Sequence, residues 1–466
     1  MQDSREKATV PEQREGIHGD WQPKKQDYHI LGSLALVSLV VALDSTILIT
    51  SLPAMSRDLG GTATEAFWAA TSYLLTYAVL QPVIASLSGV FGRRKSLFVS
   101  VLLFAIGSLI ACLAKNFACL LAGRTIQGIR GGGVMVLVLV IATDVIPLRC
   151  LPKYQGIVQI AWAIGTMSGP LIGGVFAQLT TWRWVFYINF PICGIGLLLV
   201  LFTIPKGVLA GTAKGGAAML VASFTTFLVA ITLGGTTFPW GTVHIILPLV
   251  IGILGIAATF VWELLGARAP ILPPSLFRRR FSTVPYICAF IQGFLFIPAS
   301  IISGILVTKC GHLRLFIVIG WALTILATGL LSLCHGILVV GHVYAAQANV
   351  SSDDAANATA FCCFTRSIGF CAGVAIGGSI VQNILTVKLK NRWLSGSIAT
   401  DAVSYAGMLR SLPADEPTTI VLMEVFSDSF QVLALALTGI AGLGGVLSLM
   451  VPRYVSGFRA SRHGEV

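Results

Sequence analysis

The chain has 466 residues, of which 55% are hydrophobic and only 11% are charged, and its formal net charge is +12. A soluble domain carries about 25% charged residues, so this chain has too few polar side chains to cover a water-soluble fold of its length. Disordered segments need low hydrophobicity, and with disorder also excluded the composition predicts an all-α polytopic membrane protein.

Hydropathy divides the chain into a polar tail and a series of spans. Residues 1–30 contain no apolar run beside a small-residue cleavage site, so we expect no cleavable signal peptide and a first span that serves as its own signal. About 20 apolar residues cross a hydrocarbon core, and the apolar runs here are too long and continuous for barrel strands. The predicted spans are 31–53, 67–88, 97–114, 118–142, 156–179, 185–204, 216–234, 244–266, 284–308, 315–334, a short one at 336–348, 360–385 and 429–451.

Basic residues alternate between the loops. In the N-terminal tail and the eight loops after it, the Lys and Arg counts are 5, 1, 3, 1, 2, 1, 2, 0 and 4, so one face carries 16 and the other 3. Because cytoplasmic loops carry the excess of Lys and Arg, we expect a cytoplasmic N-terminus. The net charge then needs no nucleic-acid partner.

This alternation fails around the segment 284–308. Arg278 to Arg280 precede it, and Lys309 and Arg314 follow it. Both of its ends therefore favour the cytoplasmic face, which a single crossing cannot satisfy. Either the segment is re-entrant, or part of a helical hairpin is absent from this chain.

The sharpest motif lies in the segment 156–179. Glycines spaced by four leave a strip without side chains on one helix face, so that another helix can approach closely. A proline within such a helix removes one backbone hydrogen bond and permits a bend. A single glycine pair of this kind marks only a packing seam, whereas the full spacing is more specific. The motif consists of Gly156, Gly165, Gly169, Pro170, Gly173 and Gly174.

This glycine motif matches the antiporter motif of the major facilitator superfamily in every position. Leu43 to Ile47 resemble the first-helix signature of its fourteen-spanning drug:proton antiporter branch, and residues 121–133 resemble the fourth-helix motif, with Arg124 and Gln127. The loop residues Gly92, Arg93, Arg94 and Lys95 are similar to the end of the family's cytoplasmic loop motif. The resemblance covers nearly the whole chain and is to the fungal multidrug and secondary-metabolite efflux type.

The resemblance implies a major facilitator fold with two helical bundles and two central linker helices. The corresponding divisions are a cytoplasmic tail at 1–30, an N-terminal six-helix bundle at 31–204, linker helices at 205–283, a shortened C-terminal bundle at 284–451 and a cytoplasmic tail at 452–466. The resemblance also implies that residues are missing from the chain near 296–297 and 334–336, through either a genuine deletion or a gene-model error.

The resemblance also implies proton-coupled efflux of small amphipathic compounds such as drugs, toxins or secondary metabolites. We expect a plasma-membrane protein, a monomer, whose partners are its substrate and the bilayer and which uses the proton gradient with no cofactor. We find no paired catalytic carboxylates, nucleophile or metal-ligand cluster that would predict an enzyme.

Asp44 and Arg124 are the candidates for proton coupling. An ionisable side chain within a span costs about 2.5–3.5 kcal/mol on insertion scales, so it normally faces a cavity or a partner. A carboxylate that faces a cation can bind and release a proton as its surroundings change. The alternative is a static ion pair that holds the first and fourth helices together.

Other candidates depart from the family pattern. The loop motif expects a glycine and an aspartate where this chain has Ala85 and Gly89, which leaves open that Arg93, Arg94 and Lys95 are only topology anchors. Arg130 stands where the fourth-helix motif expects a small residue.

Three polar side chains are possible cavity residues, whereas two aromatic residues are expected at the membrane interface. The possible cavity residues are Gln127, Arg130 and Arg366. Trp68 and Tyr73 are predicted to lie in the interfacial aromatic belt.

Two rival functions remain open. One is an uptake transporter for a siderophore or nutrient. The other is a transport-inactive, truncated homologue, favoured by the absent loop carboxylate and the short C-terminal half. The complete glycine motif favours export over uptake.

Overall fold

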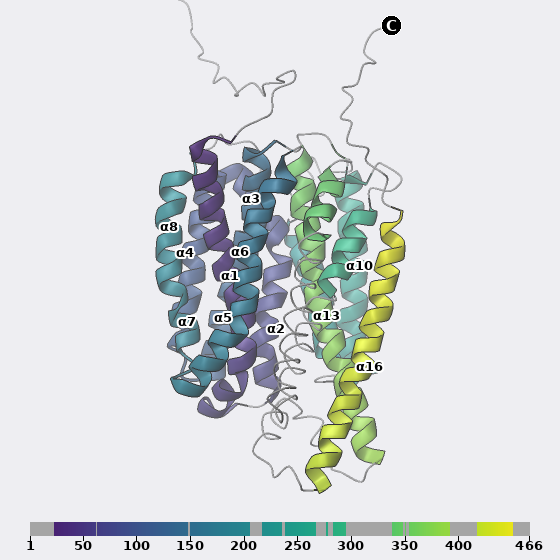
Figure 1. Ribbon diagram of the computed structural model, residues 1–466. Coiled ribbons are helices and arrows are strands. Elements are labelled where there is room, and N and C mark those ends of the chain that lie inside the picture. Colours follow the sequence, from purple (N-terminus) through teal and green to yellow (C-terminus); the bar gives the residue numbers. More distant parts are fainter. Residues whose placement is uncertain are drawn as a thin grey trace, which may run out of the picture.

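The computed structural model describes residues 23–61, 63–147, 150–205, 217–234, 238–266, 276–277, 283–294, 338–347, 350, 354–391 and 417–450. Its labelled helices are α1 (Lys25–Asp58), α2 (Ala63–Val79), α3 (Gln81–Phe91), α4 (Arg93–Cys112), α5 (Phe117–Val145), α6 (Leu151–Leu179), α7 (Trp184–Tyr187), α8 (Asn189–Thr203), α9 (Ala217–Leu233), α10 (Val243–Leu265), α13 (Ala355–Asn391) and α16 (Pro417–Ser448) (Figure 1). Eight helices in these ranges are long and apolar enough to cross a membrane, or nine if α2 and α3 form one span. The prediction of an all-α polytopic protein is confirmed.

Two predicted spans are each built from two helices. The expected span 67–88 is divided into α2 and α3, which meet at a bend of 48°. Pro82 lies in the first turn of α3, where its missing N–H leaves no helical hydrogen bond unmade but prevents α2 from continuing straight through. The span predicted at 185–204 is likewise divided, into α7 and α8 on either side of Ile188.

Helix α1 is longer than the predicted span 31–53. It begins at Lys25 because the Asp27 carboxylate accepts a hydrogen bond, 2.8 Å long, from the backbone N–H of Lys24. Such a capping interaction satisfies a donor that the first helical turn leaves free. Capping chemistry, which hydropathy does not record, thus sets this boundary among polar residues.

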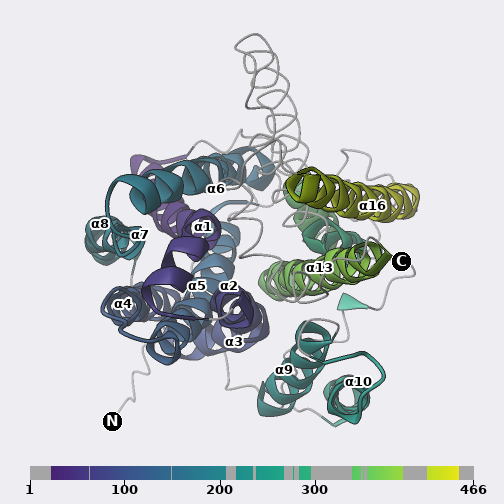
Figure 2. The same cartoon turned by 90° about the horizontal axis from the view of Figure 1, so that it is seen from below.

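Helix α5 lies in the middle of the bundle that α1 to α8 form (Figure 2). Glycines allow its neighbours to come close. A Cβ added to Gly123 would lie 2.7 Å from the backbone nitrogen of Ala111 in α4, and one added to Gly132 would lie 2.1 Å from the carbonyl oxygen of Tyr77 in α2. Small residues at these crossings let backbones pack directly, which is how helices associate in lipid.

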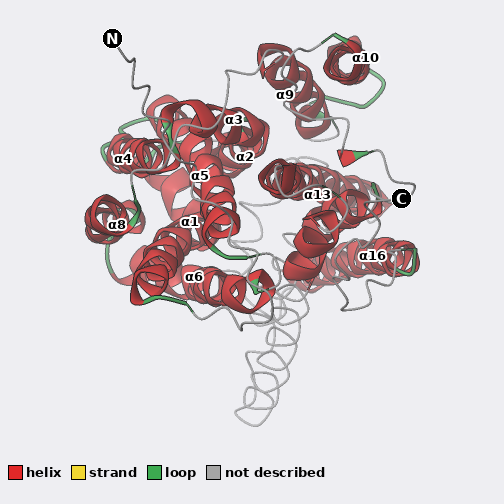
Figure 3. Ribbon diagram, turned by 90° about the horizontal axis from the view of Figure 1, so that it is seen from above, coloured by secondary structure: helices red, strands yellow, loops and turns green. Residues whose placement is uncertain are grey.

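Helix α13 joins this bundle to the rest of the described chain. It packs against α2, α3 and α5 on one side and against α9 and α16 on the others, while α9 and α10 pair with each other (Figure 3). Of the predicted segments here, 284–308 is described as a helix over Val284–Phe294, and residues 338–347 of the segment 336–348 are helical. The segment 315–334 and the predicted gaps lie outside the described residues.

The N-terminal bundle has two ends, which we name after residues that lie there. One end, which we call the Arg93 end, holds the start of α1, the turn between α3 and α4 and the end of α5. The opposite end, the Trp182 end, holds the last turn of α1 and the turn between α6 and α7. There the Trp182 indole N–H donates to the Asp58 carboxylate at 2.8 Å, and Arg183 donates to the carbonyl of Cys112 at 2.7 Å.

The turn between α3 and α4 requires glycine. Gly92 has φ +89° and ψ 141°, a conformation that L side chains rarely adopt. We predict that Gly92→Ala lowers the free energy of unfolding by about 1–3 kcal/mol, measured by thermal unfolding of the purified protein. Gly194→Ala is the control, since no atom lies within 4 Å of its added Cβ; equal unfolding temperatures for the two variants would contradict the prediction.

Candidate functional site

Asp44 and Arg124 form an ion pair inside the bundle. The guanidinium Nη1 of Arg124, on α5, donates to Oδ2 of Asp44, on α1, across 2.7 Å. The side chains are 1% and 0% exposed, respectively. The structure therefore brings together the two residues that the sequence predicts for coupling.

Two amides complete the surroundings of the Asp44 carboxylate. Its Oδ1 accepts hydrogen bonds from Asn189 of α8 at 2.9 Å and from Gln127 of α5 at 3.2 Å. The Gln127 amide also donates to the Ser108 hydroxyl of α4 at 2.7 Å, and its carbonyl accepts from Arg124 at 3.0 Å. We call Asp44, Ser108, Arg124, Gln127 and Asn189 the Asp44 cluster. Every group that touches the carboxylate donates to it, as an ionised carboxylate requires.

Tyr73 lies beneath the Arg124 guanidinium, not at the membrane interface. The ring centroid of Tyr73 is 4.3 Å from Cζ of Arg124, and the tyrosine is 1% exposed. The prediction that Tyr73 belongs to the interfacial belt is therefore wrong. Gly131 makes room for this ring, because a Cβ there would lie 2.8 Å from the tyrosine hydroxyl oxygen. A cation over an aromatic face gains further electrostatic stabilisation where water is excluded.

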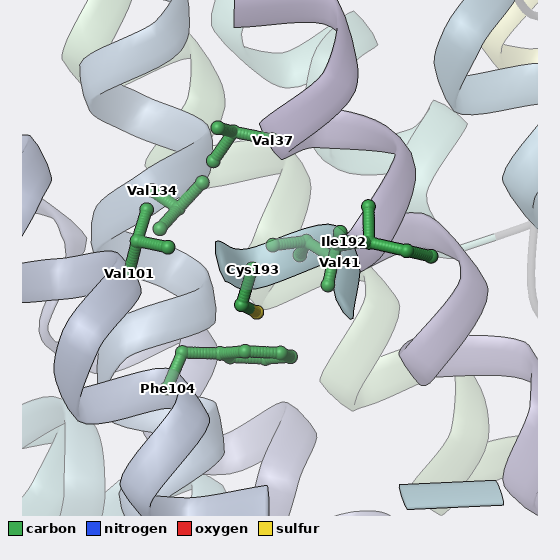
Figure 4. Close-up of a pocket in the computed structure, with 8 residues that line it drawn as sticks. Val37, Val41, Val101, Phe104, Val134, Ile192 and Cys193 are labelled. Atoms are coloured by element: carbon green, nitrogen blue, oxygen red, sulfur yellow. The ribbon is translucent and has the colours of Figure 1, made fainter. Parts of the chain in front are cut away.

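An apolar cavity lies one helical turn from the Asp44 cluster, toward the Arg93 end (Figure 4). Its walls come from α1, α4, α5 and α8, the same four helices that supply the cluster. This apolar layer therefore lies between the cluster and the Arg93 end on these four helices. The lining residues are Val37, Val40, Val41, Val101, Phe104, Val134, Ile192 and Cys193.

Three glycines of the α6 motif face α1. A Cβ added to Gly165 would lie 2.7 Å from the carbonyl oxygen of Leu39, and one added to Gly173 would lie 2.2 Å from that of Ile47. At Gly169 it would lie 2.1 Å from the hydroxyl oxygen of Thr46. The strip thus lets α6 pack against the backbone of α1 on both sides of Asp44.

The remaining motif residues do not take part in this close approach. No atom lies within 4 Å of a Cβ added to Gly156 or Gly174. Pro170 lies within α6, which is assigned as one helix from Leu151 to Leu179. Only the spacing 165, 169 and 173 therefore forms the seam with α1.

Arg93 of the loop motif is tied to α5. Its Nε donates to Oδ2 of Asp144 at 2.9 Å, and its Nη1 donates to the Ser88 hydroxyl at 2.5 Å. Arg94 donates to the carbonyl of Leu201 at the end of α8. In this structure Arg93 and Arg94 connect helix ends, which a topology anchor alone would not do, whereas no hydrogen bond is recorded for Lys95. Sequence reasoning missed Asp144, although a carboxylate at the end of a span beside a basic loop was a usable signal.

The three possible cavity residues lie in different surroundings. Gln127 belongs to the Asp44 cluster. Arg130 is partly exposed on α5 and makes no hydrogen bond or ion pair with any residue that the structure describes. Arg366 is buried in α13, where that helix meets the N-terminal bundle. Among the described residues, no group of three His, Cys, Asp or Glu side chains could hold a metal ion.

Comparisons with known proteins identify relatives along most of the chain. Residues 34–265 match the family model of the Major Facilitator Superfamily. The "MFS transporter L2" of a Phoma species is 32% identical over 91% of this chain and 81% of its own length. The "Acurin A biosynthesis cluster MFS-type transporter" of Aspergillus aculeatus is 32% identical over 80% of this chain and 77% of its own, and the "Efflux pump FUS6" of Gibberella moniliformis is 28% identical over 95% and 91%.

A solved structure shares the fold. It is described as a bacterial homologue of the human lysosomal transporter Spinster, in an inward-facing and occupied conformation. It matches with a TM-score of 0.53 and 18% identity over 92% of this chain and 98% of that chain. The alignment with the Phoma protein is 486 residues long, whereas this whole chain has 466, so the chain lacks residues that this relative has.

The seam between α1 and α6 is testable within its own motif. We predict that Gly169→Ala lowers the free energy of unfolding by about 1–3 kcal/mol, because the added methyl collides with Thr46. Gly174→Ala, five residues before the end of α6 at Leu179, adds its methyl group where no described atom lies within 4 Å and should leave stability unchanged or raised. Thermal unfolding in detergent measures both; an unaffected Gly169→Ala would show that α1 and α6 do not pack this closely.

The buried ion pair predicts strong coupling between its two residues. Asp44→Ala should cost about 3–5 kcal/mol, because it leaves the Arg124 charge buried and unpaired. The double variant Asp44→Ala with Arg124→Leu should cost less than the sum of the single variants. The half-exposed pair Lys388 and Asp428 is the control, where Asp428→Ala should cost about 0–1 kcal/mol. Additive effects at Asp44 and Arg124, measured by denaturant unfolding, would contradict the pairing.

Proposed function

The chain belongs to the Major Facilitator Superfamily of membrane transporters, and we propose that it exports small amphipathic organic compounds in exchange for protons. The observation that carries the proposal is the Asp44 cluster, in which a carboxylate of α1 is hydrogen-bonded by side chains of α5 and α8 in the interior of a spanning bundle. Ionisable groups at such positions in a membrane typically serve ion or substrate pathways. Relatives named as efflux pumps support export over uptake.

Exchange requires that Asp44 alternates between an ionised and a protonated form. In the present arrangement the carboxylate receives a charged donor and two amide donors, so the ionised form is matched. Protonation would remove the attraction to Arg124 and place a hydrogen where the amide donors now point. The five residues would then have to rearrange, which links the binding of a proton to the relative positions of α1, α5 and α8.

The Asn189 amide suits both forms of Asp44. Its nitrogen donates to the carboxylate, while its oxygen, although buried, has no hydrogen-bond partner among the described residues. Rotation of the amide by half a turn would present this oxygen to a protonated Asp44 as an acceptor. The exchange therefore needs no new side chain at the carboxylate.

The seam and the apolar cavity limit how protons could leak. Helix α6 packs tightly on α1, and the apolar layer lies between the Asp44 cluster and the Arg93 end. With the Arg93 end in the cytoplasm of a cell whose plasma membrane holds the protein, the cluster would take its proton from outside. No cofactor is needed, since the proton gradient supplies the energy and the exported compound is the small-molecule partner.

The proposal is tested in sealed vesicles with an imposed pH gradient. We expect everted vesicles that are acidic inside to accumulate the amphipathic dye rhodamine 6G, and Asp44→Asn to abolish this accumulation because the variant cannot exchange a proton. Asp44→Glu, which keeps a titratable carboxyl, should retain part of it. Asp27→Asn, at the exposed start of α1, is the control and should behave as the wild type.

Each outcome decides between the candidate functions. Accumulation only in right-side-out vesicles would select uptake. If neither this dye nor uncharged or anionic amphipathic dyes move in response to the gradient, the protein is a transport-inactive homologue. Unchanged accumulation by Asp44→Asn, with normal insertion, would remove Asp44 from the coupling.

A further inference from the structure

Arg366 is a buried cation for which the described chain supplies no counter-charge. It lies on α13 and is 6% exposed. Its Nη2 donates a weak hydrogen bond to the sulfur of Cys363, 3.7 Å away, and its Nη1 has no hydrogen-bond partner among the described residues. A buried charge normally requires a paired and hydrogen-bonded counter-charge, and the described chain supplies none for this guanidinium.

The sequence around Arg366 contains no carboxylate that could serve. No Asp or Glu occurs between Glu263 and Asp353, or from Ala355 to Asn391. These ranges include α13 itself and the helical residues 283–294 and 338–347. The sequence also contains no Asp or Glu at 295–337, 348–349 and 351–352, which lie outside the described residues.

The bundle that faces α13 also lacks a free acid near Arg366. Helices α3 and α9 contain no Asp or Glu at all. The one acid of α2, Glu65, lies in its first turn, and Asp144 of α5 is paired with Arg93. On α16, Asp428 is paired with Lys388, which is 22 residues or about 33 Å along α13 from Arg366.

Polar but uncharged groups surround the guanidinium. The ring of His342 pairs with the Gln292 amide at 3.2 Å, and Arg366 interacts electrostatically with both His342 and Tyr77. A Cβ added to Gly293 would lie 2.0 Å from the Arg366 carbonyl oxygen, so the helix that carries Gln292 crosses α13 at this residue. The groups thus come from both sides of the junction between α13 and the N-terminal bundle.

We propose that Arg366, with His342, Gln292 and Tyr77, binds the carboxylate of an amphipathic organic acid, so that the exported compounds include organic anions. The planar guanidinium forms two parallel hydrogen bonds with a carboxylate, a geometry that lysine cannot reproduce. The apolar part of the compound would lie against the largely apolar walls of the junction. This inference rests on the proposed export function and assigns its substrate class.

The stacked rings of Tyr73 and Tyr77 connect this anion site with the Asp44 cluster. Their centroids are 5.7 Å apart and the rings are inclined by 28°. Tyr73 lies beneath Arg124, and Tyr77, one turn further along α2, is close enough to Arg366 to interact with it electrostatically. A ligand at Arg366 is therefore one pair of rings away from the residues that would bind the proton.

Equilibrium binding tests the proposal without a proton gradient. The full chain in phosphatidylcholine nanodiscs, which supply no anionic lipid, is titrated with 1-naphthoate and with its uncharged methyl ester. We expect naphthoate to bind at least about tenfold more tightly than the ester, because charge-assisted hydrogen bonds have that value or more. Arg366→Gln should remove the preference and leave ester binding unchanged, and Arg366→Lys should keep only part of it.

Controls separate a binding role from a structural one. Lys115→Gln removes a positive charge from the exposed loop between α4 and α5 and should keep the wild-type preference. Arg366→Gln should unfold at the same or a higher temperature than the wild type when no ligand is present, since it removes an unpaired charge. If that variant does not fold, two other measurements test the anion site. Arg366→Lys should keep only part of the preference for naphthoate, and benzoate, but not benzamide, should compete with naphthoate for binding to the wild type.

The results distinguish this inference from the export proposal. Equal binding of acid and ester by the wild type, or a preference that persists in Arg366→Gln, overturns the anion site even when rhodamine 6G is transported. A clear, Arg366-dependent preference for the acid in a protein that moves no dye across a membrane overturns export and retains the anion site.

Discussion

The burial of one ion pair in an apolar bundle constrains most of the N-terminal half. Asp44 and Arg124 are stable there only because each has a full set of partners from the neighbouring helices. The side chains that hydrogen-bond them come from α5 and α8, the Ser108 hydroxyl of α4 accepts from both amides, and the ring of Tyr73 comes from α2. Five helices are thus held in a single relative arrangement by polar contacts that would be lost together. A change in the charge of Asp44 would disturb all of these contacts, so protonation of Asp44 would be coupled to the relative positions of the helices.

Glycine provides the close packing that this cluster needs. Short side chains such as Asp44 and Ser108 can reach one another only when the backbones that carry them are near. Gly123 and Gly132 bring α4 and α2 against α5, and Gly165, Gly169 and Gly173 bring α6 against α1. Lipid tails are as apolar as the side chains, so packing and polar contacts replace the hydrophobic effect between helices. The close packing at the glycines thus brings the polar side chains of the cluster within hydrogen-bonding distance.

The junction with α13 follows the same physical rules with one difference. Ser367 donates to Gln81 at 3.1 Å, and Gln347 donates to Thr359 at 2.6 Å and to Thr143 at 3.2 Å, so polar contacts again bridge the helices. Arg366 alone among the buried arginines of the described chain has no carboxylate to pair with. The N-terminal bundle thus holds a satisfied charge pair, whereas the junction holds an unsatisfied cation.

The sequence by itself determined the class, most span positions and the two ionisable residues of the cluster, because hydropathy and the cost of buried charge are properties of residue type. It could not determine which amides would satisfy Asp44, since Gln127 and Asn189 lie 83 and 145 positions away from it along the chain. Nor could it separate Gly169, which meets Thr46, from Gly174, which meets nothing, because facing depends on the partner helix. Tyr73 was assigned to the wrong environment for the same reason: an aromatic residue near a span end suits a membrane interface equally well until Gly131 is found to leave space for it. Only the tertiary structure decides which polar groups share an interior, since contact in space, not position in the chain, sets their electrostatic environment.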